Sequence, residues 1–505
     1  MTTRADSPGP AIREAGDPST SVWAALRSPR RLRTEVLAGL VVALALIPEA
    51  ISFSIIAGVD PRVGLFASFT MAVTIAFVGG RPAMISAATG AVALVIAPLV
   101  RQHGVDYFIA TVILAGIMQI ALSLFGVARL MRFIPRSVMV GFVNALAVLI
   151  FMSQLPHLLG VPGLVYPFVG VGLLIMVLLP KLTTAVPAPL VAILLLTAVA
   201  VVFGVDVPTV ADQGELPSSL PSLFFPHVPL TLATLSIIAP YALAMALVGL
   251  LESLMTAKLV DDITDTHSDK TREGWGQGVA NVVTGFFGGM GGCAMIGQTM
   301  INVKVSGART RISTFLAGVF LLVLVVGLGD IVGLIPMAAL VAVMIMVSFA
   351  TMDWHSIAPA TLRRMPRSET TVMAATVVVT VVSHNLAAGV IVGSLTAMVL
   401  FARRVSHMVT VQRIGTTERV IYFVSGELFF ASSNDLVYQF DYLGDPSTVV
   451  IDLTGAHIWD ASTVAALDAV TTKYRAKGKC AEIVGLNQDS AERHDRLSGQ
   501  FGADH

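Results

Sequence analysis

The chain has little charge and little cysteine. Charged residues make up 13% of its 505 residues, against about 25% in ordinary soluble proteins. Lysine plus arginine and aspartate plus glutamate both number 32, so the basic surplus of a nucleic-acid-binding protein is missing. Cys293 and Cys480 lie far apart in the sequence, which excludes a disulfide framework and a cysteine metal cluster. No Walker or dinucleotide motif occurs, and we expect a non-enzymatic protein without a cofactor.

Long apolar runs dominate the chain, with 55% hydrophobic residues and a mean hydropathy of +0.81. Since a bilayer needs about 20 apolar residues per helix, the sequence predicts an α-helical polytopic membrane protein. The candidate spans are residues 35–58, 62–79, 87–100, 106–126, 136–156, 164–180, 187–204, 232–257, 274–289, 294–303, 311–328, 331–351, 369–384 and 387–403. The segments 87–100 and 294–303 are too short to cross alone, which is typical of the binding site of a transporter.

Basic residues predict the orientation of these spans. They cluster on every second loop, at residues 27–33, 129–136, 181, 258–272, 304–311, 363–367 and 403–404. The loop 204–229 contains Asp206, Asp212 and Glu215 but no lysine or arginine. Under the positive-inside rule the basic clusters are cytoplasmic and this loop is outside. Both termini are then cytoplasmic, and the number of spans is even, at about fourteen.

The chain divides into a membrane part and a smaller second domain. We expect a disordered segment at 1–30, a transmembrane domain at 31–404, an α/β domain at 418–495 and a tail at 496–505. Ala43-Leu44 followed by Glu49 is echoed by Ala246-Leu247 followed by Glu252. The echo agrees with an inverted repeat of residues 35–204 and 232–403, because an odd number of spans per half inverts the second copy.

Glu49 and Glu252 are each the sole charge within an apolar span. A charge at mid-bilayer costs at least ~2.5 kcal/mol, so each needs a reason. One interpretation is a neutral structural acid that is hydrogen-bonded between helices. The other is coupling of transport to a proton or a cation.

The two short segments are the candidate anion site. Thr89-Gly90 begins the first and Cys293 to Gln298 begins the second. If both helices start at mid-membrane, their free N–H groups and positive dipole ends attract an anion without any lysine or arginine. The alternative is that the glycines only permit close helix packing. Phe53, one turn after Glu49, is a candidate wall of this site.

After Arg404 the pattern becomes that of a small α/β domain. Strand-like runs occur at 420–424, 449–453 and 482–486, and residues 462–475 have a helical pattern. Ser462 suits the N-cap of this helix, with Asp460 just before it.

Several motifs resemble the SulP anion transporters, the solute carrier family 26 group. They are Pro48-Glu49-Ala50-Ile51-Ser52-Phe53, Pro135-Arg136-Ser137-Val138, Gly276-Gln277-Gly278-Val279-Ala280-Asn281 and Ser306-Gly307-Ala308-Arg309-Thr310-Arg311. The tail, with Gly426-Glu427-Leu428-Phe429-Phe430-Ala431 and Asp460-Ala461-Ser462, resembles a STAS domain. The resemblance covers about residues 30–490 and is closest to bacterial proton-coupled dicarboxylate carriers.

The resemblance implies a seven-plus-seven inverted repeat with core and gate domains, forming a homodimer in the bacterial inner membrane. Substrate is then bound between the third and tenth helices, next to the first and eighth. The implied substrate-site residues are Glu49, Phe53, Thr89, Gly90, Ala294, Met295, Ile296 and Gln298. Glu252 and Thr256 stand where sodium-coupled relatives place Asp and Thr, and Ser462 matches a serine that is phosphorylated in related signalling proteins.

Gln298 departs from the family pattern, since many relatives have a basic residue there. Its neutral side chain disfavours sulfate and chloride and suits a proton-coupled carboxylate. We therefore expect proton-coupled symport of a dicarboxylate such as fumarate by alternating access.

Four alternatives stay open. The first is sodium-coupled symport of bicarbonate or sulfate, with sodium at Glu252 and Thr256. The second is an anion channel or exchanger. A signalling scaffold that binds a cytoplasmic partner through the STAS domain is the third. A nucleobase permease of the same fold is disfavoured by the STAS tail.

The alternating basic loops generate a prediction about topology. A reporter fused after Arg404 should be active only on the cytoplasmic side, because the last basic pair follows the last span. A reporter in the loop 204–229 serves as the matched external control. Activity of the Arg404 fusion outside the cell would refute the span count.

Overall fold

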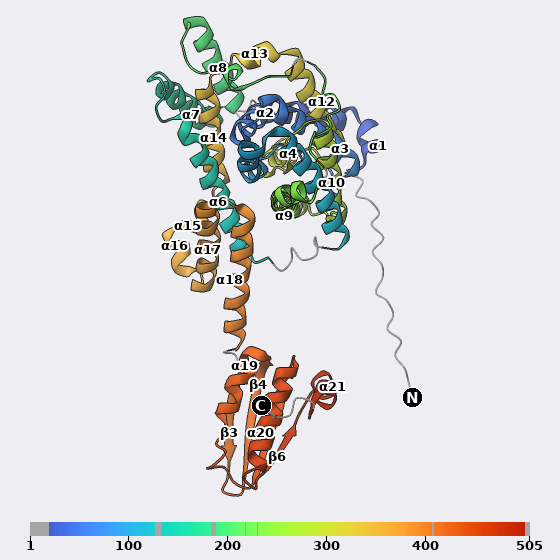
Figure 1. Ribbon diagram of the computed structural model, residues 1–505, viewed down its shortest axis with the longest axis vertical. Helices are drawn as coiled ribbons and strands as arrows, with labels where there is room; N and C mark the ends of the chain where they lie inside the picture. The colour runs from blue at the N-terminus through green and yellow to red at the C-terminus, as the bar shows by residue number, and fades with distance from the viewer. Residues whose placement is uncertain are drawn as a thin grey trace. The chain divides into compact units, whose positions relative to one another are not determined.

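A computed structural model describes residues 20–126, 134–182, 188–217, 219–229, 231–406 and 409–499. The chain forms two compact units, Met1–Gly393 and Ser394–His505 (Figure 1). Most of the expected disordered segment, residues 1–19, lies outside the described residues, as do residues 500–505 of the expected tail. The expectation of disorder over all of 1–30 is wrong, because α1 (Val22–Leu26) and the start of α2 (Pro29–Ala57) are helical.

The first helices follow the predicted spans closely. α2 and α3 (Pro61–Val78) each have a proline in the first turn. Proline is tolerated there because the N–H group that it lacks would have no acceptor within the helix. Gly58 ends α2 in the left-handed conformation, with φ 80. The predicted spans 87–100 and 106–126 correspond to the two helical parts of α4 (Gly90–Leu124). The parts meet at a kink at Gly104, whose φ of 82 is not helical.

The later helices of the membrane unit continue this pattern. They are α6 (Arg136–Gln154), η3 (Leu155–His157), α7 (Val165–Leu182), α8 (Ala188–Phe203), η4 (Ala211–Gln213), α9 (Leu232–Thr264), α10 (Lys270–Phe286), α11 (Ile296–Met300), η5 (Ile301–Val305), α12 (Arg311–Gly327), α13 (Gly329–Gly333), α14 (Met337–Thr351), α15 (Trp354–Ile357), α16 (Pro359–Arg364), α17 (Arg367–Ser383) and α18 (Leu386–Ser406). The predicted span 331–351 is divided between α13 and α14.

The helices pack in two groups. In one, which we call the core group, α10 packs against α3, α4 and α9, and α12 packs against α2 and α3 (Figure 1). In the other, the gate group, α6 packs against α14 and α17, and α7 packs against α8 and α14. These two groups supply the two sides of the cavity described below.

Two short strands join the two halves of the core group. In β1 (Ser86–Ala87) and β2 (Cys293–Ala294), Ser86 pairs with Ala294 and Ala87 with Cys293. The strands lie just before α4 and α11, so their pairing fixes where both helices begin. Glycine is required beside them, since a Cβ at Gly292 would lie 1.9 Å from the Ala87 carbonyl oxygen. The expectation that Cys293 opens the second short helix is wrong, since α11 begins at Ile296.

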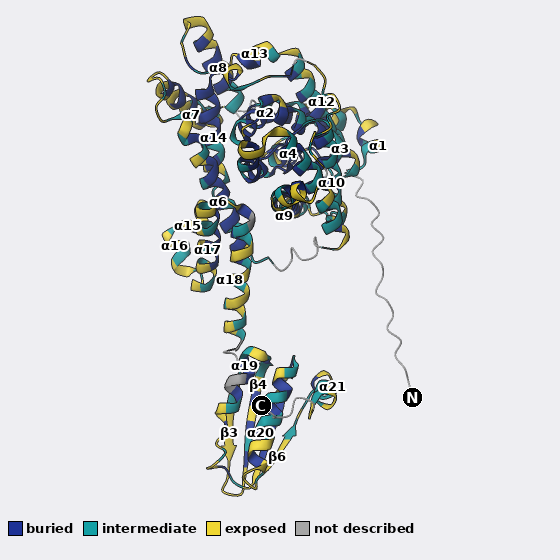
Figure 2. Ribbon diagram, viewed as in Figure 1, coloured by how far each residue is buried: buried dark blue, intermediate teal, exposed yellow. Residues whose placement is uncertain are grey.

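Burial inside the membrane unit falls from the core group outward. In the most apolar window of α2, 61% of residues are buried, against 28% in α7. Figure 2 shows the exposed positions along α7 and α8, where large apolar side chains such as Leu174, Leu194 and Val202 face outward. Among the described residues, seven helices are long and apolar enough to cross a membrane, and α8, α12 and α14 are shorter apolar helices. The outward apolar surface is therefore suited to contact with lipid.

The second unit contains a four-stranded sheet. Its strands are β3 (Thr410–Gly415), β4 (Arg419–Leu428), β5 (Thr448–Ile458) and β6 (Cys480–Val484), in that order, with β3 and β4 antiparallel and the other neighbours parallel. Its helices are α19 (Phe430–Leu436), η6 (Val437–Gln439), α20 (Ala461–Arg475) and α21 (Gln488–Leu497). The three predicted strand runs and the predicted helix are confirmed. The N-cap of α20 is Asp460, which accepts from the Thr463 N–H, and Ser462 is not the cap.

Asp445 is the polar centre of this unit. Its buried carboxylate accepts hydrogen bonds from the hydroxyls of Tyr422 (2.7 Å) and Tyr474 (2.5 Å), and Arg413 donates to it at 2.9 and 2.7 Å. Burial raises the pKa of Asp445, but these donors outweigh it and leave the pKa below its ordinary value. Because the folded pKa is the lower one, the stabilisation is present above the unfolded pKa of about 4 and is lost as pH falls through the folded value.

Asp445→Asn should therefore lower the free energy of unfolding of the second unit by roughly 2 kcal/mol at pH 7, because hydrogen bonds to a charged acceptor are lost. The measurement is hydrogen exchange of the β4 and β5 amides in the full-length protein. Glu482→Gln, at an exposed position on β6, is the control and should leave exchange unchanged. Equal exchange in the parent and Asp445→Asn would contradict this role.

Candidate functional site

A small cavity of about 100 Å³ lies between the core and gate groups. The core group contributes residues from α2, α4, α9 and the start of α11, and the gate group contributes residues from α6 and α14. The lining residues are Glu49, Phe53, Thr89, Gly90, Ala91, Phe142, Val143, Leu146, Ile150, Glu252, Met295, Ile296, Gly297, Val347 and Thr351. Two acids are the charged members of this set. The gate side is almost wholly apolar.

The first acid, Glu49, is held by α11. The Gln298 side-chain amide donates from Nε2 to Glu49 Oε1 at 2.9 Å. The other end of this amide, Gln298 Oε1, is buried and accepts no hydrogen bond from the described residues. Gln298 is 2% exposed and does not itself line the cavity, so it acts on the cavity through Glu49.

The second acid, Glu252, is held by β2. The Cys293 thiol donates to Glu252 Oε2 at 2.9 Å, and Cys293 Sγ lies 3.1 Å from Thr89 Oγ1. Cys293 thus connects the acid on α9 to the N-cap of α4. Sequence reasoning missed this role, because a lone apolar-flanked cysteine gives no signal until the pairing of β1 with β2 places it there.

The starts of two helices border the cavity. Thr89 is the N-cap of α4 and Met295 that of α11, and neither side chain makes a cap hydrogen bond. The first N–H groups of a helix have no acceptor within the helix. Ile296 to Val305 continue from α11 into the π-helix η5, so the second start belongs to a longer helical segment.

Most of the residues predicted for the site come together here, and four lie outside the lining: Gln298, described above, and Ala294, Thr256 and Ser462. Glu49, Phe53, Thr89, Gly90, Met295, Ile296 and Glu252 line the cavity. Ala294 is buried in β2, where its N–H donates to Ser253 Oγ at 3.1 Å. The Thr256 hydroxyl donates to the Glu252 carbonyl oxygen at 2.8 Å. Ser462 is exposed on the first turn of α20, in the other unit.

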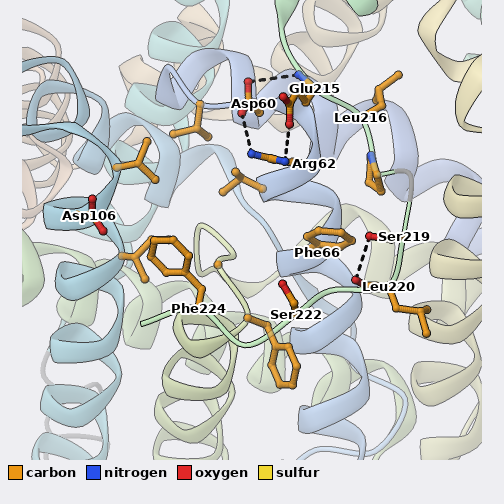
Figure 3. A pocket seen from close by; sticks show the side chains of 17 residues that line it. Asp60, Arg62, Phe66, Asp106, Glu215, Leu216, Ser219, Leu220, Ser222 and Phe224 are labelled. Atoms are coloured by element: carbon orange, nitrogen blue, oxygen red, sulfur yellow. Dashed lines mark hydrogen bonds and ion pairs between the residues drawn. The ribbon is translucent and has the colours of Figure 1, made fainter. Parts of the chain in front are cut away.

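A larger cavity of about 740 Å³ lies at the loop after α8 (Figure 3). Arg62 forms ion pairs with Glu215 at 2.5 Å and with Asp60 at 3.6 Å, and these charged groups are exposed. Arg62 is paired with Asp60 and Glu215, so no unpaired basic side chain lines this cavity among the described residues, and its size alone does not make it the transport site. A third cavity of about 480 Å³ shares Val143 and Ile296 with the small one.

These features are those of a multi-pass membrane protein with a candidate site where two helix starts meet between two helix groups. The sequence matches the model of the Sulfate permease family over residues 32–171 and 165–376, and that of the STAS domain over residues 408–499. The chain therefore belongs to the sulfate permease (SulP, solute carrier 26) family of anion transporters, with a C-terminal STAS domain, and this is a family of transporters rather than enzymes.

Relatives and solved structures agree with this membership. The chain is 54% identical over 459 residues to "Putative sulfate transporter YbaR" of Bacillus subtilis (strain 168), covering 91% of this chain and 95% of that protein. The transmembrane domain of a cyanobacterial bicarbonate transporter, BicA, is 26% identical with a TM-score of 0.64, over 72% of this chain and 98% of that one. Murine solute carrier 26 family member A9 shares the fold at 16% identity and a TM-score of 0.79, over 93% and 88%.

The contact between Gly90 and Phe53 generates a prediction. A Cβ at Gly90 would lie 2.8 Å from Phe53 Cε1, so Gly90→Ala should push the ring into the cavity. Overpacking of this kind costs about 1–3 kcal/mol. If the bound state carries that cost, substrate affinity falls roughly tenfold to a hundredfold. Gly327→Ala in α12 is the matched control, because a Cβ there meets nothing within 4 Å. Equal affinities of the two variants would place the substrate elsewhere.

Proposed function

We propose that this protein imports a compact oxyanion, with sulfate as the first candidate, together with protons. The observation that carries the proposal is the cavity itself: two helix starts and two acids line it, and among the described residues no lysine, arginine or histidine does. Each helix start contributes about half a positive charge, and the free N–H groups there can bind the oxygens of an anion. Such a site suits a small oxygen-rich anion.

The expected preference for fumarate is not supported. The relatives described above are named for sulfate and bicarbonate. The inference from neutral Gln298 against sulfate loses its basis, because the side chain is buried against Glu49 and does not face the cavity.

Two observations favour a proton over sodium at Glu252. Its side-chain partner is the Cys293 thiol, whereas hard cations such as sodium are held by oxygen ligands. The Thr256 hydroxyl, the oxygen expected to help bind sodium, donates to the backbone of its own helix and does not line the cavity. A carboxyl group beside a thiol can instead gain and lose a proton without a coordination shell.

The path to the cytoplasm in this proposal runs through the cavity of about 480 Å³. Arg136 and Lys258 line it together with Asp262 and Asp353, and Val143 with Ile296 separates it from the site. Sequence places these basic residues on the cytoplasmic side. The proposal keeps several predictions made from the sequence. They are cytoplasmic termini, location in the bacterial plasma membrane and a homodimer. For the STAS domain they are phosphorylation at Ser462 and binding of a cytoplasmic partner.

Glu252→Gln tests the coupling. The amide keeps the shape of the protonated acid, so labelled sulfate should still exchange across proteoliposome membranes. Uphill accumulation driven by a pH gradient should be lost, because proton and anion no longer load as linked ligands. Counterflow and pH-driven uptake are measured at matched protein, with and without sodium and with bicarbonate as the competing anion.

Thr256→Val is the matched variant on the same helix and should retain pH-driven uptake. Three results would reject the proposal: full pH-driven accumulation by Glu252→Gln, uptake that requires sodium and is lost in Thr256→Val, or sulfate current at the Nernst potential of the anion, which indicates a channel.

A further inference from the structure

Among the described residues of the membrane unit, Glu35, Glu252 and Glu273 are buried and Glu49 is half-buried. Their hydrogen-bond donors divide these four glutamates into two pairs. Glu35 accepts from the backbone N–H groups of Arg309 (2.9 Å), Thr310 (3.1 Å) and Ser313 (3.3 Å). Glu273 accepts from the N–H groups of Gly80 (2.8 Å) and Arg81 (2.9 Å) and from Gln277 Nε2 (2.8 Å). Backbone donors cannot reverse, and several of them favour the charged carboxylate. Glu35 and Glu273 are thus each held by at least two backbone N–H groups whose direction is fixed.

Glu49 and Glu252 have a different environment. Each lines the cavity, and each accepts one side-chain hydrogen bond from the described residues, from Gln298 and from Cys293 respectively. Both partners can donate or accept, since an amide carries both functions and a thiol is a weak donor and weak acceptor. A carboxylate and a carboxylic acid can therefore both be satisfied at either position.

The Gln298 amide is suited to this reversal. Its Nε2 donates to Glu49, while its Oε1 is buried without a partner among the described residues. Rotation of the amide exchanges the two ends within the same volume, so Oε1 can accept from a protonated Glu49. The amide can therefore pair with either protonation state of Glu49, through Nε2 when Glu49 is ionised and through Oε1 when it is protonated.

We propose that Glu49, positioned by Gln298, is a second proton site in the cavity that contains Glu252, and that one divalent oxyanion is carried with two protons. This rests on the proposed function and specifies its stoichiometry. With both acids ionised, the empty cavity carries two negative side-chain charges. With both acids protonated and a divalent anion bound, the total is the same.

A single proton per anion would leave one additional negative charge. Such a charge is unfavourable within the membrane, and in the part of the chain that the structure describes no basic side chain lines the cavity to offset it. Arg136 and Lys258 line the neighbouring cavity, where Asp262 and Asp353 balance them. The charge carried by the moving site is therefore conserved when two protons accompany each divalent anion, and transport is electroneutral.

The experiment measures the sulfate gradient that a pH gradient sustains in proteoliposomes, with the membrane potential clamped at zero by potassium and valinomycin. Full-length protein should accumulate sulfate about a hundredfold per pH unit if two protons are coupled, and about tenfold if one is. Glu49→Gln should fall to about tenfold per unit, and its transport should become sensitive to an imposed potential. Gln298→Met, which removes both amide functions, should fall likewise.

Counterflow at equal pH verifies that each variant is folded and exchanges sulfate. A parent that accumulates about tenfold per pH unit, with Glu49→Gln unchanged, overturns the second proton site and leaves the proposed function standing. So does an unchanged hundredfold slope in both variants, and if Glu49→Gln is inactive, the slope of Gln298→Met decides alone. A parent with counterflow but no response to pH refutes the proposed function itself.

Discussion

The pairing of β1 with β2 is the constraint on which the site depends. Within a membrane every backbone polar group needs an internal partner, so two helices can begin there only if the chain before them is hydrogen-bonded. The strands bond to each other, and the chain next to β2 is held by Asn281, which accepts from the Gly292 N–H at 2.8 Å and donates to the Gly292 carbonyl at 3.0 Å. Gln119 in turn accepts from Asn281 at 2.8 Å. This network fixes both helix starts against the same cavity.

That arrangement shows how the proposed anion site could do without basic residues. The helix starts provide partial positive charge that cannot be titrated or moved. In the proposal, the mobile charge is left to the two cavity acids, each with a partner that can donate or accept. A fixed arginine in the cavity would bind an anion more tightly in every state, whereas coupling requires that anion and proton stabilise each other's binding.

Sequence reasoning predicted the elements better than their junctions. The apolar runs gave most helices, because length and hydropathy are strong constraints in a bilayer. The lone charges Glu49 and Glu252, the two short segments and the family resemblance together led to seven residues that line the cavity. The start of α11 was misplaced, because Cys293 and Ala294 are paired as a strand with residues some two hundred positions away. The gate residues Val143, Leu146 and Ile150 were missed, since apolar residues in an apolar span carry no distinguishing pattern.

The difference between the two walls of the cavity has a mechanical consequence. The hydrogen bonds at the site run from Gln298 to Glu49, from Cys293 to Glu252 and between Cys293 and Thr89. They join α2, α4 and α9 of the core group to β2 and α11. The gate group faces them with hydrocarbon, mainly from α6. Apolar contacts have no preferred direction, so the two groups can slide or part without leaving a buried polar group unpaired. Under the proposed two-proton coupling, the site would then travel as a unit with its charge unchanged, which is what alternating access demands of a protein that moves an anion through hydrocarbon.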